Sequence, residues 1–371
     1  MHGTRILEEA DRLMTVCNSC RYCEGLCAVF PAMEMRRAFS DGDLNYLANL
    51  CHSCGACYTD CQFSPPHEFN VNVPQTLAVA RNDSYAAYVW PRAFAGAFAR
   101  NGLVISIVAA LSVAAFIFGF AAFTDPLVLL GVHTGPGAFY KLMPHNAMAA
   151  LFGAAFLYAI VALAMGVVAF WRDIGEPVGM KTDWRSLLQA MRDAGELRYL
   201  DGGGVGCFNE DDKPTDRRKL YHHLTFYGFG LCFAATCVAT LYHYLFAREA
   251  PYAWWDLPVV LGTLGGIGLL IGPVGLLAEK RKRDPVLVDA TRMGMDVSFI
   301  VMLFLTSLTG IALLLLRDTS AMGPLLALHL GVVFSLFVTM PYGKFVHGIY
   351  RYVALVRYAR ERQMMHGAGN E

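Results

Sequence analysis

The sequence predicts an all-α protein in two parts: a cysteine-rich helical domain over residues 1–100 and a bundle of membrane-spanning helices over residues 101–371. Two observations lead to this division. Eight of the eleven cysteines fall within the first 61 residues, and six long apolar segments follow residue 100. Hydrophobic residues make up 56% of the chain and charged residues only 16%, whereas soluble domains carry about 25% charged residues.

The eight N-terminal cysteines form two blocks that both read C-x2-C-x2-C-x3-C. This is the ligand pattern of bacterial ferredoxins, in which three neighbouring thiolates hold one cubane cluster and the fourth cysteine ligates the other cluster. The pattern predicts two [4Fe-4S] clusters, one on Cys17, Cys20, Cys23 and Cys61, and the other on Cys51, Cys54, Cys57 and Cys27.

Two other uses of these cysteines fit the pattern less well. Zinc usually takes two C-x2–4-C pairs separated by a longer spacer, and disulfides need an oxidising compartment. The proline that often follows the fourth cysteine is absent, with Ala28 and Gln62 in its place. We therefore expect iron–sulfur clusters.

The domain around the cysteines shows helical rather than strand periodicity. Thr4, Ser40 or Asp41, and Asn72 are candidate N-caps, and Pro74 suits the first turn of a helix. The expected helices cover residues 6–14, 33–39, 43–50 and 72–88. Because strand signals are scarce, we expect an α-helical ferredoxin-like domain rather than the small β-hairpin type.

Six apolar segments are long enough to cross a hydrocarbon core about 30 Å thick. They cover residues 103–123, 147–170, 224–246, 257–277, 297–316 and 325–346. All but three of the 30 lysines and arginines fall in the termini and the loops on one side, including loop 171–223. By the positive-inside rule, the clusters and both termini are expected to face the cytoplasm from the inner membrane. The charged, amphipathic N-terminus does not read as a signal peptide.

Five histidines lie near the ends of two predicted spans: His222, His223 and His243 on the third, and His329 and His347 on the sixth. These spans run in opposite directions, so each side of the membrane receives a histidine from each helix. A b-type haem with two imidazole ligands needs one ring on either side of its iron. The arrangement therefore predicts one or two haems in a cytochrome b-like bundle.

At the cytoplasmic side we expect His347 to pair with His222 or His223. His329 and His347 are 18 residues apart, which is five turns of a helix, so both rings are expected to face the same way.

At the outer side we expect His243 to pair with His329, while His145 at the start of the second span competes for either. Arg351 and Arg248 are placed to pair with haem propionates; alternatively they anchor the membrane edge. The histidines themselves have a simpler alternative, as interfacial residues bonded to backbone or lipid head groups. Ionisable residues in spans are nonetheless expensive and usually functional.

Loop 171–223 carries two further signals. Residues 181–199 predict an amphipathic helix capped by Thr182 or Asp183. The glycine-rich segment 200–207 that follows is either a flexible turn or a docking segment for the cysteine-rich domain or a partner enzyme. It does not fit a dinucleotide fingerprint, because no strand precedes it. Cys207 is a spare thiol with no assigned role.

With these motifs in hand, the chain resembles the tricarballylate-utilisation protein B family over nearly its full length. The resemblance rests on the two cysteine blocks, HEFNVNVP at 67–74, the glycine segment 200–207, HHLTFYGF at 222–229 and ATLYH at 239–243. It implies electron transfer from a separate FAD-dependent dehydrogenase, which oxidises tricarballylate to cis-aconitate, to the respiratory chain. The helical cluster domain also resembles those of heterodisulfide reductase and succinate dehydrogenase iron–sulfur subunits.

The sequence contains no Walker A motif, nicotinamide or flavin fold, or evident substrate-oxidising site, and its net charge of zero gives no pull toward nucleic acid. We therefore expect an electron-transfer subunit that relays electrons from a cytoplasmic flavoprotein through two clusters and haem to membrane quinone. Two alternatives are a quinol-oxidising module that feeds a cytoplasmic reductase, and a membrane redox sensor.

Overall fold

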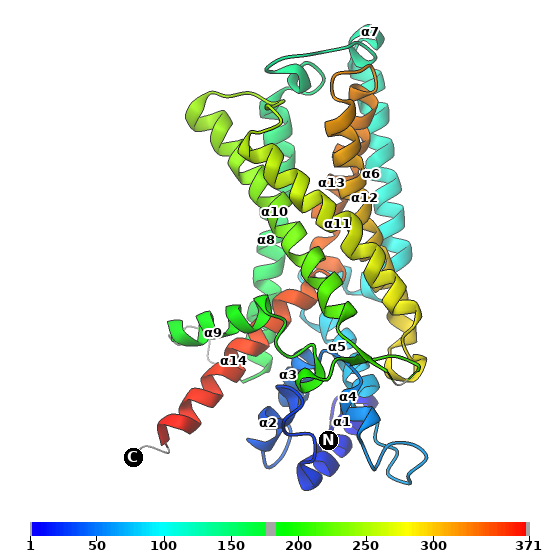
Figure 1. Cartoon of the computed structure of the whole chain (residues 1–371), viewed down its shortest axis with the longest axis vertical. Coiled ribbons are helices and arrows are strands. Elements are labelled where there is room, and N and C mark those ends of the chain that lie inside the picture. Colours follow the sequence, from blue (N-terminus) through cyan, green and yellow to red (C-terminus); the bar gives the residue numbers. More distant parts are fainter. Residues whose placement is uncertain (1, 176–182, 212, 369–371) are drawn as a thin grey trace.

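The computed structural model describes residues 2–175, 183–211 and 213–368. Long helices form an extended bundle, and a small helical domain covers one end of it (Figure 1). The strands in the described residues are the short antiparallel pair β1 (Cys207–Phe208) and β2 (Pro214–Thr215). The predicted all-α fold class is confirmed.

The cysteine-rich domain consists of short helices joined by the cysteine-bearing turns. They are α1 (Arg5–Cys20), α2 (Val29–Glu34), α3 (Asp41–Leu50), α4 (Ala56–Thr59), α5 (Val73–Tyr88) and the 3-10 helix η1 (Arg92–Phe98). Three predicted caps are present. Thr4 accepts a hydrogen bond from the backbone of Leu7, Ser40 forms a capping box with Asp43, and Asn72 caps α5.

Two helix boundaries in this domain differ from the prediction. The first helix continues to Cys20 rather than ending at residue 14, and the helix expected at 33–39 lies at Val29–Glu34. Packing explains the second difference. Val29 and Phe30 are buried in the core, so the helix begins where those side chains reach it.

All six predicted spans are helices long and apolar enough to cross a membrane. They are α6 (Asn101–Phe123), α8 (His145–Asp173), α10 (Arg217–Phe246), α11 (Leu257–Arg281), α12 (Met293–Leu316) and α13 (Met322–Thr339). Short helices α7 (Pro126–Leu129) and η2 (Ala138–Lys141) connect α6 to α8, and η4 (Pro285–Leu287) and η5 (Ala290–Arg292) precede α12.

The sixth span ends earlier than its apolar sequence predicts. Helix α13 stops at Thr339, the 3-10 turn η6 (Met340–Tyr342) follows, and α14 (Val346–Ala368) leaves in a new direction along the base of the bundle (Figure 1). Pro341 has no backbone N–H to continue the helix. His329 and His347 therefore lie on different helices, and the prediction that one helix aligns them is wrong.

Helices α10 and α11 cross closely because glycines meet at the crossing. A Cβ on Gly228 would lie 2.9 Å from the carbonyl oxygen of Gly265, and a Cβ on Gly265 would lie 2.7 Å from that of Gly228. Small residues allow backbones to approach in membrane bundles, where packing replaces the hydrophobic effect between helices.

The helix predicted at 181–199 is the shorter α9 (Trp184–Gly195); Lys181 and Thr182 lie outside the described residues. It ends because Leu197 has a positive φ of 48°. Asp183 occupies the N-cap position, but its side chain makes no cap hydrogen bond.

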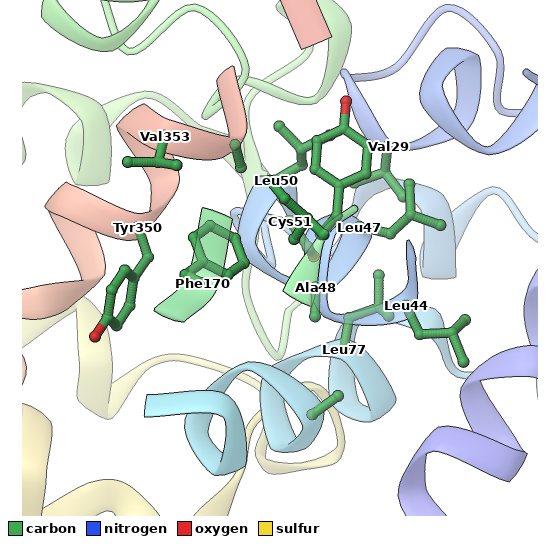
Figure 2. Packing of buried hydrophobic residues seen from close by; sticks show 14 of the residues in the cluster. Val29, Leu44, Leu47, Ala48, Leu50, Cys51, Leu77, Phe170, Tyr350 and Val353 are labelled. Atoms are coloured by element: carbon green, nitrogen blue, oxygen red, sulfur yellow. The ribbon is translucent and has the colours of Figure 1, made fainter. Parts of the chain in front are cut away.

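A single hydrophobic core joins the cysteine-rich domain to the base of the bundle. Figure 2 shows Leu47 of α3 and Leu77 of α5 in one cluster with Phe170 of α8 and Tyr350 of α14. The rings of Phe170 and Tyr350 lie 5.4 Å apart. Burial of such large side chains contributes about 2–3 kcal/mol each, so the domain is fixed firmly to the spans.

A polar network ties the same two parts together beside this core. Arg36 pairs with Asp43 at 2.7 Å and with Glu361 of α14, while Arg357 of α14 contacts both carboxylates. Tyr46 donates a hydrogen bond of 3.0 Å to Glu361. Both arginine side chains are nearly buried. Buried charges need a partner of opposite sign, and each arginine has one in Asp43 and Glu361.

We predict that Gly42→Ala weakens the docking of the cysteine-rich domain. A Cβ at Gly42 would lie 1.9 Å from the backbone oxygen of Asp173 in α8, and a backbone atom cannot move aside easily. Overpacking of this kind costs about 1–3 kcal/mol, measurable as a lower thermal midpoint of the purified protein. Gly96→Ala, which meets no atom within 4 Å, serves as the control and should leave the midpoint unchanged.

The network also predicts acid sensitivity. Burial raises the pKa of Asp43, but hydrogen bonds from Arg36 and Ser40 outweigh it and hold this pKa below its usual range. A depressed carboxylate pKa stabilises the fold above the unfolded value, near 4, and that stability is lost as pH falls through the folded value. Asp43→Asn should flatten the stability profile below about pH 4; the exposed Asp318→Asn should retain its slope. An unaltered profile in Asp43→Asn contradicts the assignment.

Candidate cofactor site

The first group of thiols lies near the surface of the cysteine-rich domain. A cavity of about 240 Å³ is lined by Cys17, Cys20, Cys23 and Cys61, together with Asp60 and Cys57. Helix α1 ends in a left-handed residue, Arg21 (φ 58°), which turns the chain so that the third cysteine returns toward the first two. Burial and then the neighbouring thiols of this group raise the pKa of Cys17 to about 12.

The second group of thiols lies deeper, toward the bundle. Burial, followed by Cys54, Cys27 and Cys51, raises the pKa of Cys57 well above its usual value. Cys51 caps the end of α3, and Gly55 (φ 92°) turns the chain into α4. The structure thus gathers three thiols of each block with the fourth thiol of the other block, which is the grouping that the spacing predicts.

The two thiol groups lie close enough to interact electrostatically. The charge of Cys23 in the first group contributes to the raised pKa of Cys57 in the second. Among the described residues, no three His, Cys, Asp or Glu side chains are placed to hold one metal ion. A cubane distributes four thiolates over separate irons, so its ligands need not converge on a single point.

The glycine-rich segment docks on the cysteine-rich domain, as one of the two sequence interpretations proposed. A Cβ on Gly202 (φ 55°) would lie 2.7 Å from Ala56 Cβ, and one on Gly203 (φ 78°) would lie 3.1 Å from Gly25 O. The backbone N–H of Phe208 donates to the carbonyl of Cys54 at 2.9 Å. Only residues without a Cβ can approach this closely, so the segment covers the second thiol group.

His222 of α10 and His347 of α14 meet at the inner end of the bundle. Their ring centres are 6.1 Å apart and their planes are inclined by 71°. The Nδ1 of His347 lies 2.5 Å from the carbonyl of Lys344, which leaves its Nε2 for another partner. Within the part of the chain that the structure describes, the buried Nδ1 of His222 meets no hydrogen-bond partner. His223 instead lies 3.2 Å from Gly195 O.

This inner pair fits a metal bound between two imidazoles. Two rings that bind one metal from opposite sides through bonds of about 2 Å have centres roughly 6 Å apart. A backbone carbonyl that fixes Nδ1–H, as at His347, is the usual second contact of a metal-binding histidine. The sequence left His222 and His223 open as the neighbour of His347. In the structure it is His222 whose ring lies beside His347.

Of the outer histidines, the structure brings together His243 and its alternative partner His145. Their ring centres are 3.4 Å apart and their planes are inclined by 15°, which leaves no room for a metal between the two rings. His329 lies 2.9 Å from the hydroxyl of Thr309. In this arrangement His145, the competing partner that the sequence offered, lies beside His243, whereas the ring of His329 is bonded to Thr309 of α12.

Arginines near the inner pair were largely missed by sequence reasoning. Arg351 donates to the carbonyl of Cys51 at 2.9 Å, and Arg218 donates to the carbonyl of His52 at 3.0 Å. Each lies four residues from a histidine of the pair, a spacing that puts both side chains on one helix face. This spacing is the signal that could have identified Arg218. Arg248, the other expected propionate partner, instead pairs with Asp256 at 2.8 Å.

Comparisons with known proteins cover nearly the whole chain. Residues 10–87 match the family described as "Citrate utilization protein B Fer4-like domain", and residues 97–368 match "Citrate utilization protein B". Citrate utilization protein B of Escherichia coli is 50% identical over 362 residues, which are 97% of this chain and 94% of that protein. No solved structure matches the chain.

Proposed function

Because this chain belongs to the citrate utilization protein B family, we propose that it is the electron-transfer subunit of a membrane dehydrogenase complex. In this proposal a cytoplasmic FAD-dependent dehydrogenase, which oxidises tricarballylate, delivers the electrons and membrane quinone receives them. The Fer4-like domain and the six apolar helices support the outline of an iron–sulfur carrier in a membrane.

The residues suited to hold cofactors lie in a series from the surface to the bundle. Cys17, Cys20, Cys23 and Cys61 would hold one [4Fe-4S] cluster, and Cys27, Cys51, Cys54 and Cys57 the other. His222 and His347 would hold one haem b. When bound, such clusters and haem each take up and release a single electron.

One observation carries the proposal. Helices α10 and α14 each present a histidine to the inner pair and, four residues away, an arginine to the loop of the second cysteine block. The same two helices therefore carry the histidine pair and hold the loop of the second cysteine block. Short separation is what electron transfer between two cofactors requires, and these contacts hold the separation constant.

The side chains around His347 also suit electron transfer that is not coupled to proton transfer. Burial, followed by the charges of Lys344 and Arg351, lowers the pKa of His347 well below its usual value. A neutral imidazole is the form that binds a metal. The arrangement of basic loops puts the clusters on the cytoplasmic side of the inner membrane in this proposal, within reach of a soluble dehydrogenase.

The proposal is tested by a dithionite-reduced minus oxidised spectrum of the anaerobically purified protein, with EPR on the same sample. We expect the α-band of a b-type haem and the signals of two interacting cubane clusters. Clusters without haem would leave the iron–sulfur carrier but remove the histidine step. Zinc in place of both cofactors would overturn the proposal.

We predict that Cys54→Ser nearly abolishes quinone reduction. Its thiol is buried among the second group, so the variant should lose about half of the cluster iron while the first cluster remains. Iron content and donor-to-quinone turnover measure the effect. Cys237→Ser, at an exposed position in α10, is the matched control, and equal turnover in both variants would exclude the relay.

We predict that His347→Ala removes the haem signal and leaves the cluster signals. The variant lacks one of the two rings that lie 6.1 Å apart, and a single imidazole cannot give the six-coordinate spectrum. His243→Ala, at the stacked outer pair, should keep the full haem content. Loss of haem from His243→Ala but not from His347→Ala would place the haem at the other end of the bundle.

A further inference from the structure

Four arginines from four separate segments converge on the loop Cys51–Ser53. Arg81 of α5 donates to the carbonyl of Cys51 at 2.5 Å, and Arg351 of α14 donates to the same carbonyl at 2.9 Å. Arg218 of α10 donates to the carbonyls of His52 and Ser53 at 3.0 and 3.1 Å, and Arg283 donates to that of Ser53. We refer to these four side chains as the arginine cluster.

The arginine cluster has no paired carboxylate among the described residues. None of its members forms an ion pair with Asp or Glu in the part of the chain that the structure describes. The Nε atoms of Arg283 and Arg351 are buried and find no hydrogen-bond partner in the described segments. Burial and the charge of Arg218 lower the pKa of Arg283 to about 9. Buried like charges are costly unless an anion compensates them.

The group that would carry the compensating negative charge beside the arginine cluster is the second thiol group with its bound cubane. The loop that the arginines hold contains Cys51 and leads directly to Cys54, and Arg218 Nη1 lies 4.0 Å from the sulfur of Cys207 beside it. A cubane on four thiolates is a net anion, and reduction adds one more negative charge. Cations fixed in a buried site stabilise the reduced form more than the oxidised form.

The first thiol group has the opposite surroundings. Cys20 is exposed to solvent, and Asp60 lines the same cavity as the four thiols. The negative charge of Asp60 also contributes to the raised pKa of Cys23. Water screens an added negative charge at this group, whereas the fixed carboxylate of Asp60 opposes it.

We propose that the arginine cluster raises the reduction potential of the cluster on Cys27, Cys51, Cys54 and Cys57 above that of the other cluster, and so makes it the one that passes electrons to the histidine pair. The inference rests on the proposed function, since it requires both clusters to be present. Burial alone would disfavour the more negative reduced state; four guanidinium groups reverse that preference.

The transfer balances without any covalent change. One electron lost by the first cluster is gained by the second, which then loses it to the haem iron as ferric iron becomes ferrous. No bond forms or breaks and no proton is exchanged. Arg218 and Arg351 are positioned to act in both steps. Each holds the loop of the second thiol group and lies one helical turn from a histidine of the inner pair.

The test is an EPR-monitored redox titration of the full-length protein and its variants. Arg351→Gln and Arg283→Gln should each lower the potential of one cluster while the other cluster stays unchanged. Arg351→Lys, which keeps the positive charge, should retain most of the wild-type potential. Arg37→Gln removes an exposed charge of the same domain and should alter neither potential.

A second kind of variant tests the cluster on the first thiol group. Asp60→Asn removes the carboxylate beside the first thiol group and should raise the lower of the two potentials, which narrows the difference between them. Integrated EPR intensity and iron content establish that each variant still holds both clusters. A variant that loses its iron is replaced by the corresponding lysine variant.

Three results would overturn the inference. Unchanged cluster potentials in both glutamine variants would show that the arginines do not act on the cluster. A shift of the haem potential alone would assign them to haem carboxylates instead. An Asp60→Asn shift in the higher-potential cluster would reverse the order. In each case two intact clusters leave the proposed function standing, whereas a protein without clusters fails the proposed function itself.

Discussion

The shared hydrophobic core between the cysteine-rich domain and the base of the bundle is the constraint on which the rest depends. Helices α3 and α5 bury one side against α8 and α14, and Tyr85, Tyr88, Phe170 and Tyr350 interleave there. Because this core fixes the two parts relative to each other, the second thiol group and the inner histidines keep a constant arrangement.

The two thiol groups have the same cysteine spacing, but the charged residues around them differ. Both blocks have the same motif, yet one lies beside Asp60 near solvent and the other beneath a covering segment next to four arginines. The difference arises from tertiary structure, since Arg218, Arg283 and Arg351 come from positions far along the chain. In the proposed relay, two identical sets of cysteine ligands would therefore serve different roles.

The sequence was sufficient for the features that local rules determine. The cysteine groups followed from spacing, the six spans from apolar length, and the caps at Thr4, Ser40 and Asn72 from side-chain chemistry. It failed where distant segments decide. Pro341 gave a local hint that the sixth helix breaks, but the apolar run continued past it, and the phase argument for His329 and His347 assumed one straight helix. The sequence offered both His329 and His145 as neighbours of His243; the choice of His145 depends on which helices pack together, and hydropathy contains no such information.

The change of direction between α13 and α14 has a consequence for the proposed relay. After the break at Met340–Tyr342, the helix turns along the cysteine-rich domain, and its Arg357 and Glu361 join the polar network with Asp43. One helix thus supplies a ring to the inner pair and also holds the cysteine-rich domain beside it. In the proposed carrier, electrons would therefore cross fixed distances instead of travelling on a moving domain, and their transfer should be insensitive to solvent viscosity.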